Sequence, residues 1–434
     1  MVKTKVLNSG TRLAVDEMKG FEGVAFKIFV FTGSANESEE KDYGISHLIE
    51  HMMFKGTDKR NALQIVQEFD KFGIQSNAYT SEEVTCYYTY GTKDSLEKSV
   101  EILSDMFFNS KFDNDELKRE KQVVIEEIDM YQDRPDIVCE TEINRTLYDG
   151  TNFSHDIAGT AETVAKITRE QIFDYINKRY TPKNIILSVA GNVKMEEIEQ
   201  LVEKYFEPNF KIKEKYVPNH KDELHIVTKT QSKVKKDTSQ AQVCIAYKSN
   251  NKYKIKENTL NIIISYILGG GMSSRLFQEV REKLSLVYNI SAYNDTNAYS
   301  GKILISLGTN PKKVPLALKT IKKVIDESVK NGFTQEELDQ AKIMAISNIK
   351  LQSDSPNNQA SINASQLQVY NKTMSKEQRI ARILDIKLDD VNAQLKNLFD
   401  NKNYCISMVA DNTDLDLIGL YEGKALKKNK ENVK

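Results

Sequence analysis

Cysteine is scarce in this sequence, and the few cysteines are isolated from one another. The 434 residues contain four, Cys86, Cys139, Cys244 and Cys405, with no CxxC pair. Disulfide frameworks and thiolate metal sites both depend on characteristic cysteine spacings. We therefore expect reduced, buried thiols and neither of those two uses.

An excess of charge and long apolar runs are missing as well. The 61 basic and 62 acidic residues leave a formal net charge of -1, whereas nucleic-acid-binding proteins carry a basic excess. No stretch approaches the 18 uninterrupted apolar residues of a membrane-spanning helix. The first residues, MVKTKVLNSGTRLAVDEM, lack the apolar core of a signal peptide and the pattern of a transit peptide. We expect a cytoplasmic protein that binds neither nucleic acid nor membrane.

Histidine is also rare, but two of the five histidines stand close together. His47 and His51 lie in GISHLIEHMMFKGT, with Glu50 between them. Residues four apart lie on one face of a helix, and Glu50 lies beside the same point. Two imidazoles and a nearby carboxylate suit a catalytic zinc and the base that acts on its water. HxxEH is itself a metalloprotease signature.

A chance pattern on a partly buried helix is the alternative interpretation of this cluster. The residues around it are apolar, however, among them Ile45, Leu48 and Met52. Burying two histidines and a glutamate is costly unless something pairs with them. A metal site is therefore the better explanation.

The chain is long enough for several domains, and its second half repeats the pattern of the first. AQVCIAY echoes VAFKIFV, and SAYNDTNAYSGKILISLGT echoes NAYTSEEVTCYYTYGT. Between them, the proline- and lysine-rich composition predicts a linker with an edge strand. We expect a metal-binding domain over 1–210, a linker over 211–235 and a homologous domain over 236–434.

The two copies differ where the chemistry is expected. Moving the HxxEH residues forward by 218 positions reaches Ser265, Leu268 and Gly269, which cannot hold zinc. A cluster needed only for packing would leave some trace in the second copy. Its loss favours a functional role in the first.

A zinc ion held by two histidines needs a third protein ligand. The helix predicted over 113–130 offers Glu120 and Glu127, seven residues apart and therefore on one face. Their counterparts in the second copy are Ala341 and Asn348. The carboxylates are thus missing from the same half as the histidines. The other glutamates of this helix are more simply interpreted as a solvated acidic face.

With these motifs, the chain resembles the inverted-zinc peptidases of the pitrilysin, insulin-degrading enzyme and mitochondrial processing peptidase type. Their signature is HxxEH followed by glutamate after about 76 residues, and here 51 plus 76 gives 127. YTPKNIILSVAGNV and GGGMSSRLFQEVREKLSLVY also fit, and the length matches the short branch near the processing peptidase β subunit and its bacterial relatives. The resemblance implies an α+β fold of two homologous α/β-roll domains, each a sheet with helices packed on one face, forming half of a clamshell.

The resemblance also implies roles for the residues of the metal site. His47, His51 and Glu127 would bind one Zn²⁺ per chain. Glu50 would be the general base, and Glu120 would orient a zinc-binding histidine.

Four further residues match positions that would contact the substrate. Arg281 and Tyr288, in VREKLSLVY, match a pair that hydrogen-bonds near the scissile carbonyl; by themselves they would be a surface arginine and a half-buried strand tyrosine. Asn77 and Ala78 match an edge strand to which a peptide adds as a further strand.

These implications amount to a zinc metalloendopeptidase that acts on unfolded peptides or short polypeptides in a dimeric chamber. A homodimer would suffice because one chain carries every motif, although a heterodimer with a ligand-less sister stays open. The alternative is a non-catalytic subunit that is structural or holds peptides. A metal-storage or sensing protein fits poorly, because it has no use for a base beside an open metal position. The sequence does not specify the substrate.

Overall fold

The computed structural model describes residues 2–214, 224, 226, 228–399 and 403–424. Its chain forms two compact units, each assembled from more than one stretch of sequence. Unit 1 comprises 1–129, 155–219 and 348–380, and unit 2 comprises 130–154, 220–347 and 381–434. Of the expected linker over 211–235, residues 215–223, 225 and 227 lie outside the described part of the chain.

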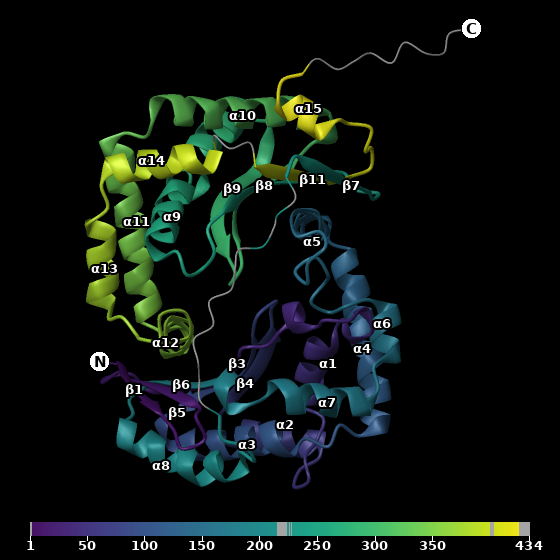
Figure 1. The fold of residues 1–434 in the computed structure, drawn as a ribbon, viewed down its shortest axis with the longest axis vertical. Helices are drawn as coiled ribbons and strands as arrows, with labels where there is room; N and C mark the ends of the chain where they lie inside the picture. The colour runs from purple at the N-terminus through teal and green to yellow at the C-terminus, as the bar shows by residue number, and fades with distance from the viewer. Residues whose placement is uncertain (1, 215–223, 225, 227, 400–402, 425–434) are drawn as a thin grey trace. The chain divides into compact units, whose positions relative to one another are not determined.

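Unit 1 is built on a six-stranded sheet with strand order β1-β2-β6-β3-β5-β4 (Figure 1). Its strands are β1 (Val2–Val6), β2 (Arg12–Glu17), β3 (Gly23–Val30), β4 (Gln75–Thr80), β5 (Thr85–Thr92) and β6 (Ile185–Gly191). Its helices are α1 (Ile45–Met52), α2 (Ala62–Lys71), α3 (Leu96–Asn109), most of α4 (Asn114–Gln132), α6 (Ala161–Lys166), α7 (Arg169–Arg179), α8 (Met195–Tyr205) and α12 (Pro356–Tyr370). Among the described strands of unit 1, only β2 and β6 pair in parallel.

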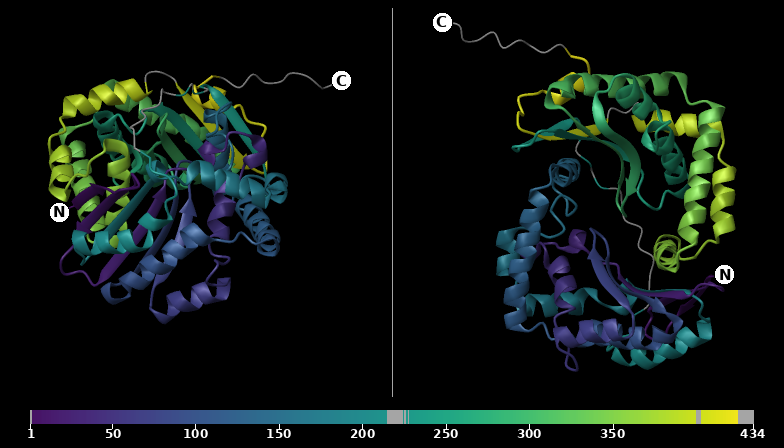
Figure 2. Two further views of the ribbon diagram at one scale, coloured as in Figure 1. Left: turned by 60° about the horizontal axis from the view of Figure 1, so that its bottom comes forward. Right: turned by 180° about the vertical axis from the view of Figure 1, so that it is seen from behind.

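The two faces of this sheet have different partners because side chains alternate along each strand. On β3, Phe26 and Ile28 face the core that α1, α3 and α8 share. The next residues, Lys27 and Phe29, face α12 instead. The expected layer of helices on one face is therefore present, and α12 covers part of the other face (Figures 1 and 2).

Polar contacts fix α12 on the sheet. The Lys27 ammonium donates to Ser361 Oγ at 2.9 Å, and Ser188 Oγ donates to the Ala360 carbonyl at 2.7 Å. The Arg12 guanidinium donates to the Leu367 carbonyl at 3.0 Å. Buried charged side chains need such partners, so α12 is an integral part of unit 1 although it comes from the second half of the sequence.

Unit 2 repeats the plan with a five-stranded sheet of order β7-β11-β8-β10-β9. Its strands are β7 (Thr230–Lys235), β8 (Ala241–Ser249), β9 (Val287–Thr296), β10 (Gly301–Thr309) and β11 (Tyr404–Ala410). Its helices are α5 (Pro135–Leu147), α9 (Ile255–Gly269), α10 (Val314–Asn331), most of α11 (Gln335–Ser353), α14 (Leu388–Phe399) and α15 (Leu417–Tyr421), while α13 (Lys376–Leu384) is divided between the two units after Ile380.

Helix α5 has the reciprocal position to α12. It comes from the first half of the sequence and packs on β8 and β11 of unit 2. There Cys139 Sγ lies 3.3 Å from Ser407 Oγ, and Ser407 Oγ donates to the Cys139 carbonyl at 2.8 Å. Each sheet thus receives one helix from the other half of the chain.

The internal repeat inferred from the sequence is confirmed by the elements. β5 ends at Thr92 and β10 ends at Thr309, the last residues of the matching stretches NAYTSEEVTCYYTYGT and SAYNDTNAYSGKILISLGT. The two long helices α4 and α11 have 19 residues each. All four cysteines are free and buried, as expected. Among the described residues, no helix has the length and apolar character needed to cross a membrane.

Candidate metal centre

Helix α1 carries the HxxEH residues, and its start is fixed by a buried carboxylate. The helix begins after Gly44, whose φ of 91° is left-handed and whose added Cβ would lie 2.4 Å from the Ala158 carbonyl oxygen. The Glu37 side chain accepts hydrogen bonds from Gly44 N and Ser46 N, both at 2.9 Å. It thereby satisfies backbone groups that a helix start leaves unpaired. Burial raises the pKa of Glu37, although these hydrogen bonds oppose the shift.

The apolar side of α1 determines where its histidines lie. Leu48, Ile49 and Met52 are at most 1% exposed and belong to the core of unit 1. The opposite side of the helix carries His47 and His51, whose rings have centroids 4.6 Å apart. Both rings therefore lie on one face of α1, as the four-residue spacing predicts.

Glu127 of α4 meets both rings. Its Oε2 lies 3.3 Å from His51 Nε2 and 3.8 Å from His47 Nε2. One ligand atom from each of these three residues lies within 4.8 Å of the others. Ligands about 2.0–2.1 Å from a tetrahedral zinc are roughly 3.3 Å apart. The three side chains therefore fit one metal ion of that size.

The histidine environments also suit a metal. Burial, helped by the neighbouring His51, lowers the pKa of His47 to about 4, so its ring is neutral at physiological pH. Metal coordination requires the neutral ring. His47 Nδ1 is buried and has no hydrogen-bond partner within the described residues. For His51, burial lowers the pKa, but the hydrogen bond with Glu120 and nearby carboxylates outweigh it and raise the pKa overall.

Glu120 orients His51 and is itself held by a lysine. Its Oε1 lies 2.9 Å from His51 Nδ1, and Lys55 Nζ lies 2.6 Å from its Oε2. Burial by itself would raise the pKa of Glu120, but the contacts with His51 and Lys55 lower it overall. An ionised Glu120 can only accept a hydrogen bond, which His51 Nδ1–H donates. Nε2 of His51 is then the nitrogen without a hydrogen, and it faces Glu127.

Glu50 lies on α1, and its side chain contacts the end of β4. Thr80 Oγ1 donates to Glu50 Oε2 at 2.6 Å. Burial raises the pKa of Glu50, and the hydrogen bond from Thr80 opposes that shift. A carboxyl group with a raised pKa beside a candidate metal centre suits a general base.

Asn77 and Ala78 lie on β4, which pairs with β5 alone and is an edge strand. Ser81 N donates to Val84 O, so in the alternating ladder the N–H and C=O of Ala78 point away from β5. The Ala78 N–H donates to Asn77 Oδ1 at 2.8 Å. An added strand would use the same N–H and would displace that side chain.

The structure places Arg281 and Tyr288 in unit 2. Arg281 belongs to the π-helix Phe277–Lys283, with its guanidinium carbon 4.6 Å from the centroid of the Phe277 ring. Tyr288 lies on β9 and is 63% exposed. The centre in unit 1 is formed without them.

The second copy uses the matching positions for packing. Ser265, Leu268 and Gly269 are all buried in α9. A Cβ added at Gly269 would lie 2.5 Å from the Ala292 nitrogen of β9. Close packing of α9 on β9 thus replaces the ligands that α1 carries.

Lys55 and Thr80 are contacts of the site that motif reading did not single out. Lys55 follows His51 by four residues, a spacing that favours the same side of a helix. Thr80 follows Ala78 by two residues, so it faces the same side of the sheet. Both signals are present in the sequence but are common in any chain.

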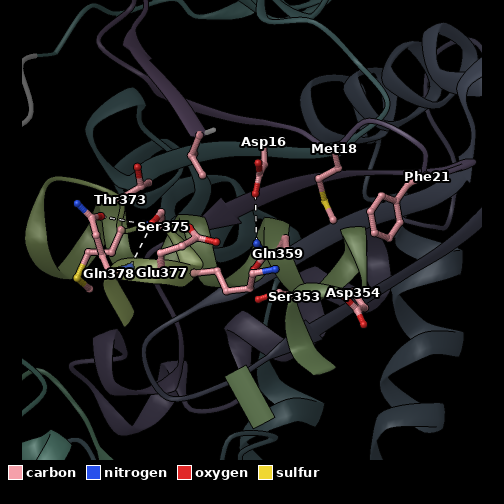
Figure 3. A pocket seen from close by; sticks show the side chains of 13 residues that line it. Asp16, Met18, Phe21, Ser353, Asp354, Gln359, Thr373, Ser375, Glu377 and Gln378 are labelled. Atoms are coloured by element: carbon pink, nitrogen blue, oxygen red, sulfur yellow. Dashed lines mark hydrogen bonds between the residues drawn. The ribbon is translucent and has the colours of Figure 1, made fainter. Parts of the chain in front are cut away.

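A separate pocket of about 530 Å³ lies in unit 1 beside α12. Figure 3 shows Asp16 of β2 joined to Gln359 of α12, with Met18 and Phe21 nearby. The Gln359 amide donates to Asp16 Oδ2 at 3.3 Å. None of the residues expected in the metal site lines this pocket.

Comparison with known proteins agrees with the fold and the site. The family model described as Insulinase (Peptidase family M16) matches residues 14–161, and the model described as Peptidase M16 inactive domain matches residues 166–344. The second match begins in the first half, extends through β7 to β10 of unit 2 and contains none of the three expected metal ligands.

Individual relatives match almost the whole chain. The Bacillus subtilis (strain 168) protein named "Uncharacterized zinc protease YmxG" is 33% identical over 410 residues, 94% of this chain and 98% of its own. A Rickettsia felis protein named "Uncharacterized zinc protease" is 31% identical over 402 residues, 91% of this chain and 94% of its own. The crystal structure of a protease from Helicobacter pylori is 25% identical, with a TM-score of 0.87 over 94% of this chain and 99% of that one.

The architecture is therefore that of the two-domain peptidase folds, with mixed sheets packed against helices. The chain belongs to peptidase family M16, as a short two-domain member. This confirms the resemblance inferred from the motifs.

Proposed function

We propose that this protein is a zinc-dependent endopeptidase that hydrolyses peptide bonds in unfolded peptides. The observation that carries the proposal is the convergence of His47, His51 and Glu127, with ligand atoms within 4.8 Å of one another. Glu50 lies on α1, the helix that carries both histidines, and burial raises its pKa. The relatives named zinc protease support this chemistry.

His47, His51 and Glu127 would hold the metal, and Glu120 would keep His51 oriented. A bound zinc would supply a Lewis acid that polarises a carbonyl group and lowers the pKa of water. Glu50 would take a proton from that water at Oε1, because Oε2 accepts from Thr80, and pass it to the leaving amine.

The peptide would bind along the free edge of β4. The outward N–H and C=O of Ala78 offer backbone hydrogen bonds, and the Asn77 side chain would move from the Ala78 N–H to admit the peptide. Backbone pairing needs an extended chain and accepts many side chains, which favours unfolded substrates. Arg281 and Tyr288 would hydrogen-bond the substrate near the scissile carbonyl, each a donor of the type that stabilises developing negative charge.

A non-catalytic subunit that only holds peptides is the second candidate, since the same strand edge would bind them without cleavage. Incubation of the purified protein with a mixed peptide library, with and without a chelator, separates the two. We expect chelator-sensitive cleavage, read by mass spectrometry. Binding without cleavage would support the second candidate instead.

Substitution of the base tests the mechanism. Glu50→Gln should retain zinc and lower kcat by at least about 100-fold, because it removes the proton acceptor but no metal ligand. Zinc content by elemental analysis and peptide turnover are the measurements. Turnover at the wild-type rate would refute the role of Glu50.

We further propose a homodimer in which Arg281 and Tyr288 of one chain serve the metal site of the other. A single sequence carries both sets, so two identical chains suffice. Mixing the inactive variants His47→Ala and Arg281→Ala should then restore roughly a quarter of wild-type activity, since half of the dimers would be mixed and each would have one intact site. If the mixed variants exchange subunits but recover no activity, that result would contradict an active site shared between two chains.

A further inference from the structure

Lys55 lies in a turn whose backbone is held on both sides. Helix α1 ends at Met52, and Lys55 N donates to the Met52 carbonyl at 3.1 Å. The next residue, Gly56, has a φ of 120°, a conformation that glycine adopts most readily. Its carbonyl accepts from Lys111 N at 3.1 Å. The backbone therefore fixes the direction in which the Lys55 side chain leaves the turn.

The segment after Gly56 is tied to α3. Thr57 Oγ1 donates to Asp105 Oδ2 at 2.7 Å, and Arg60 Nη1 donates to the same atom at 2.7 Å. The side chains of Arg60 and Asp105 are 8% and 2% exposed. A buried network of this kind holds the turn in one position.

From this turn, Lys55 reaches the far side of Glu120. Its Nζ lies 2.6 Å from Oε2, while His51 Nδ1 lies 2.9 Å from Oε1. The Glu120 side chain is 6% exposed and that of Lys55 is 30% exposed, so water screens this pair less than a surface pair. One oxygen of the carboxylate is thus held by the lysine and the other by the histidine.

The charges around the centre give this lysine a further role. Glu50, Glu120 and Glu127 bring three carboxylates to one small region. In the described part of the chain, Lys55 is the lysine or arginine that pairs with any of them. Its positive charge therefore offsets the cost of burying the Glu120 carboxylate.

We propose that Lys55 is a positioning residue of the metal centre: it holds the Glu120 carboxylate against His51 and so pre-organises His51 Nε2 to bind the metal. The inference rests on the proposed zinc site and adds a residue to it. Lys55 acts through Glu120 and touches neither the metal ligands nor the substrate. Partners of this kind commonly change metal affinity by 10- to 100-fold.

Zinc affinity of the full-length protein, measured by competition with a chromophoric chelator, tests the proposal without reliance on turnover. Lys55→Met should weaken zinc binding by about tenfold, whereas Lys55→Arg, which keeps the charge, should stay near the wild-type affinity. Lys59→Met is the matched control, because Lys59 is an exposed lysine of the same segment. It should leave the affinity unchanged.

A double-mutant cycle shows whether the effect passes through Glu120. Glu120→Gln should itself weaken zinc binding, and adding Lys55→Met to it should cause no further loss. An additional tenfold loss in the Glu120→Gln background would overturn the proposal, as would equal losses in Lys55→Met and Lys55→Arg. Thermal unfolding of the metal-free variants identifies any that fail to fold, in which case the Lys55→Arg comparison decides.

Failure of the proposal is distinguishable from failure of the proposed function. A wild-type protein that binds no zinc would refute the zinc site altogether. Tight wild-type binding that Lys55→Met leaves unchanged would refute the role of Lys55 alone.

Discussion

His51 uses both of its ring nitrogens, and both partners lie on α4. Nδ1 contacts Glu120 and Nε2 faces Glu127, two acids seven residues apart on that helix. Because the His51 ring lies between these two acids, the rotation of α4 about its own axis determines the orientation of the ring. The face of α4 that carries Glu120 also carries the buried Leu117 and Val124, which pack into the core. Core packing of α4 thus places Glu120, and Glu120 selects the tautomer of His51 on α1.

Thr80 is the residue through which β4 contacts the proposed base. Thr80→Val keeps the shape of the side chain but removes the hydroxyl that holds Glu50 Oε2. We expect kcat to fall by about 10- to 100-fold, because a misplaced base loses its alignment, while KM and zinc affinity stay near wild-type values. Steady-state kinetics and chelator competition check both parts.

Two variants serve as controls for this substitution. Thr80→Ser retains a hydroxyl and should recover most of the activity. Thr89→Val, on the neighbouring strand β5, removes a buried hydroxyl without a hydrogen-bond partner and should have little effect on kcat. A normal kcat in Thr80→Val would show that Glu50 needs no such support.

At the level of residues, helical spacing accounts for part of the predicted site, and the rest of the prediction came from other features of the sequence. The helical period placed His47, Glu50 and His51 together, since their positions depend on local geometry. Glu127 was reached through the internal repeat and the family resemblance, because nothing local links α4 to α1. Lys55 and Thr80 were not predicted, since an ordinary lysine and an ordinary strand threonine acquire partners only when distant elements pack.

At the level of elements, the segment between α1 and α2 is stabilised by one buried arginine. Arg60 contacts Glu68 at 3.0 Å, Glu101 at 2.7 Å and Asp105 at 2.7 Å, which joins α2 and α3 to this segment. The surrounding carboxylates raise the pKa of Arg60 against the opposing effect of burial. The end of α1 is thereby tied to two neighbouring helices.

Replacing that arginine should destabilise unit 1. Arg60→Met leaves the buried Asp105 carboxylate without its cation, whereas Glu68 and Glu101 each keep Lys98 at 2.8 Å. We expect the free energy of unfolding to fall by about 3–5 kcal/mol. Chemical denaturation monitored by circular dichroism measures the change. Arg119→Met is the comparison, because the Arg119–Glu116 pair is exposed on α4 and should contribute far less to stability. Equal effects of the two variants would show that burial does not strengthen the Arg60 cluster.

At the level of the whole molecule, the two halves of the sequence are not independent structures. α12 completes unit 1 and α5 completes unit 2, so each compact unit contains a segment from the other half. The domain expected over 1–210 contains the whole first sheet, and the domain expected over 236–434 contains the second sheet except β7, but neither range includes this exchange. The exchange occurs because each sheet has a second face to be covered. Buried residues on that face, such as Phe29 and Ile186 in unit 1, need cover that their own half of the sequence does not provide.

A fragment of residues 1–214 tests this dependence. Without α12, the face that carries Phe29 and Ile186 loses its cover. We expect the fragment to be less stable than unit 1 in the intact protein by roughly 3 kcal/mol or more, from lost apolar burial. Denaturation of the fragment, with and without a peptide spanning 353–371, measures the difference.

The added peptide should restore part of that stability. The same peptide with Ala360→Glu should not, because Ala360 is fully buried against Ala25 and Ala190. A fragment as stable as the intact unit, and indifferent to the peptide, would contradict the assigned role of α12.

By itself, the sequence determined the local geometry and the duplication. The spacing of the HxxEH residues and the face shared by Glu120 and Glu127 follow from periods of a few residues, which hold wherever the chain goes. The paired strand endings follow from the repeat of the sequence pattern in the second half. Tertiary structure decided which distant segments meet. It brought Glu127 to the two histidines, Lys55 to Glu120, Thr80 to Glu50, and α12 and α5 to sheets of the opposite half. These contacts depend on how buried faces are covered, and many different segments could satisfy the same local pattern.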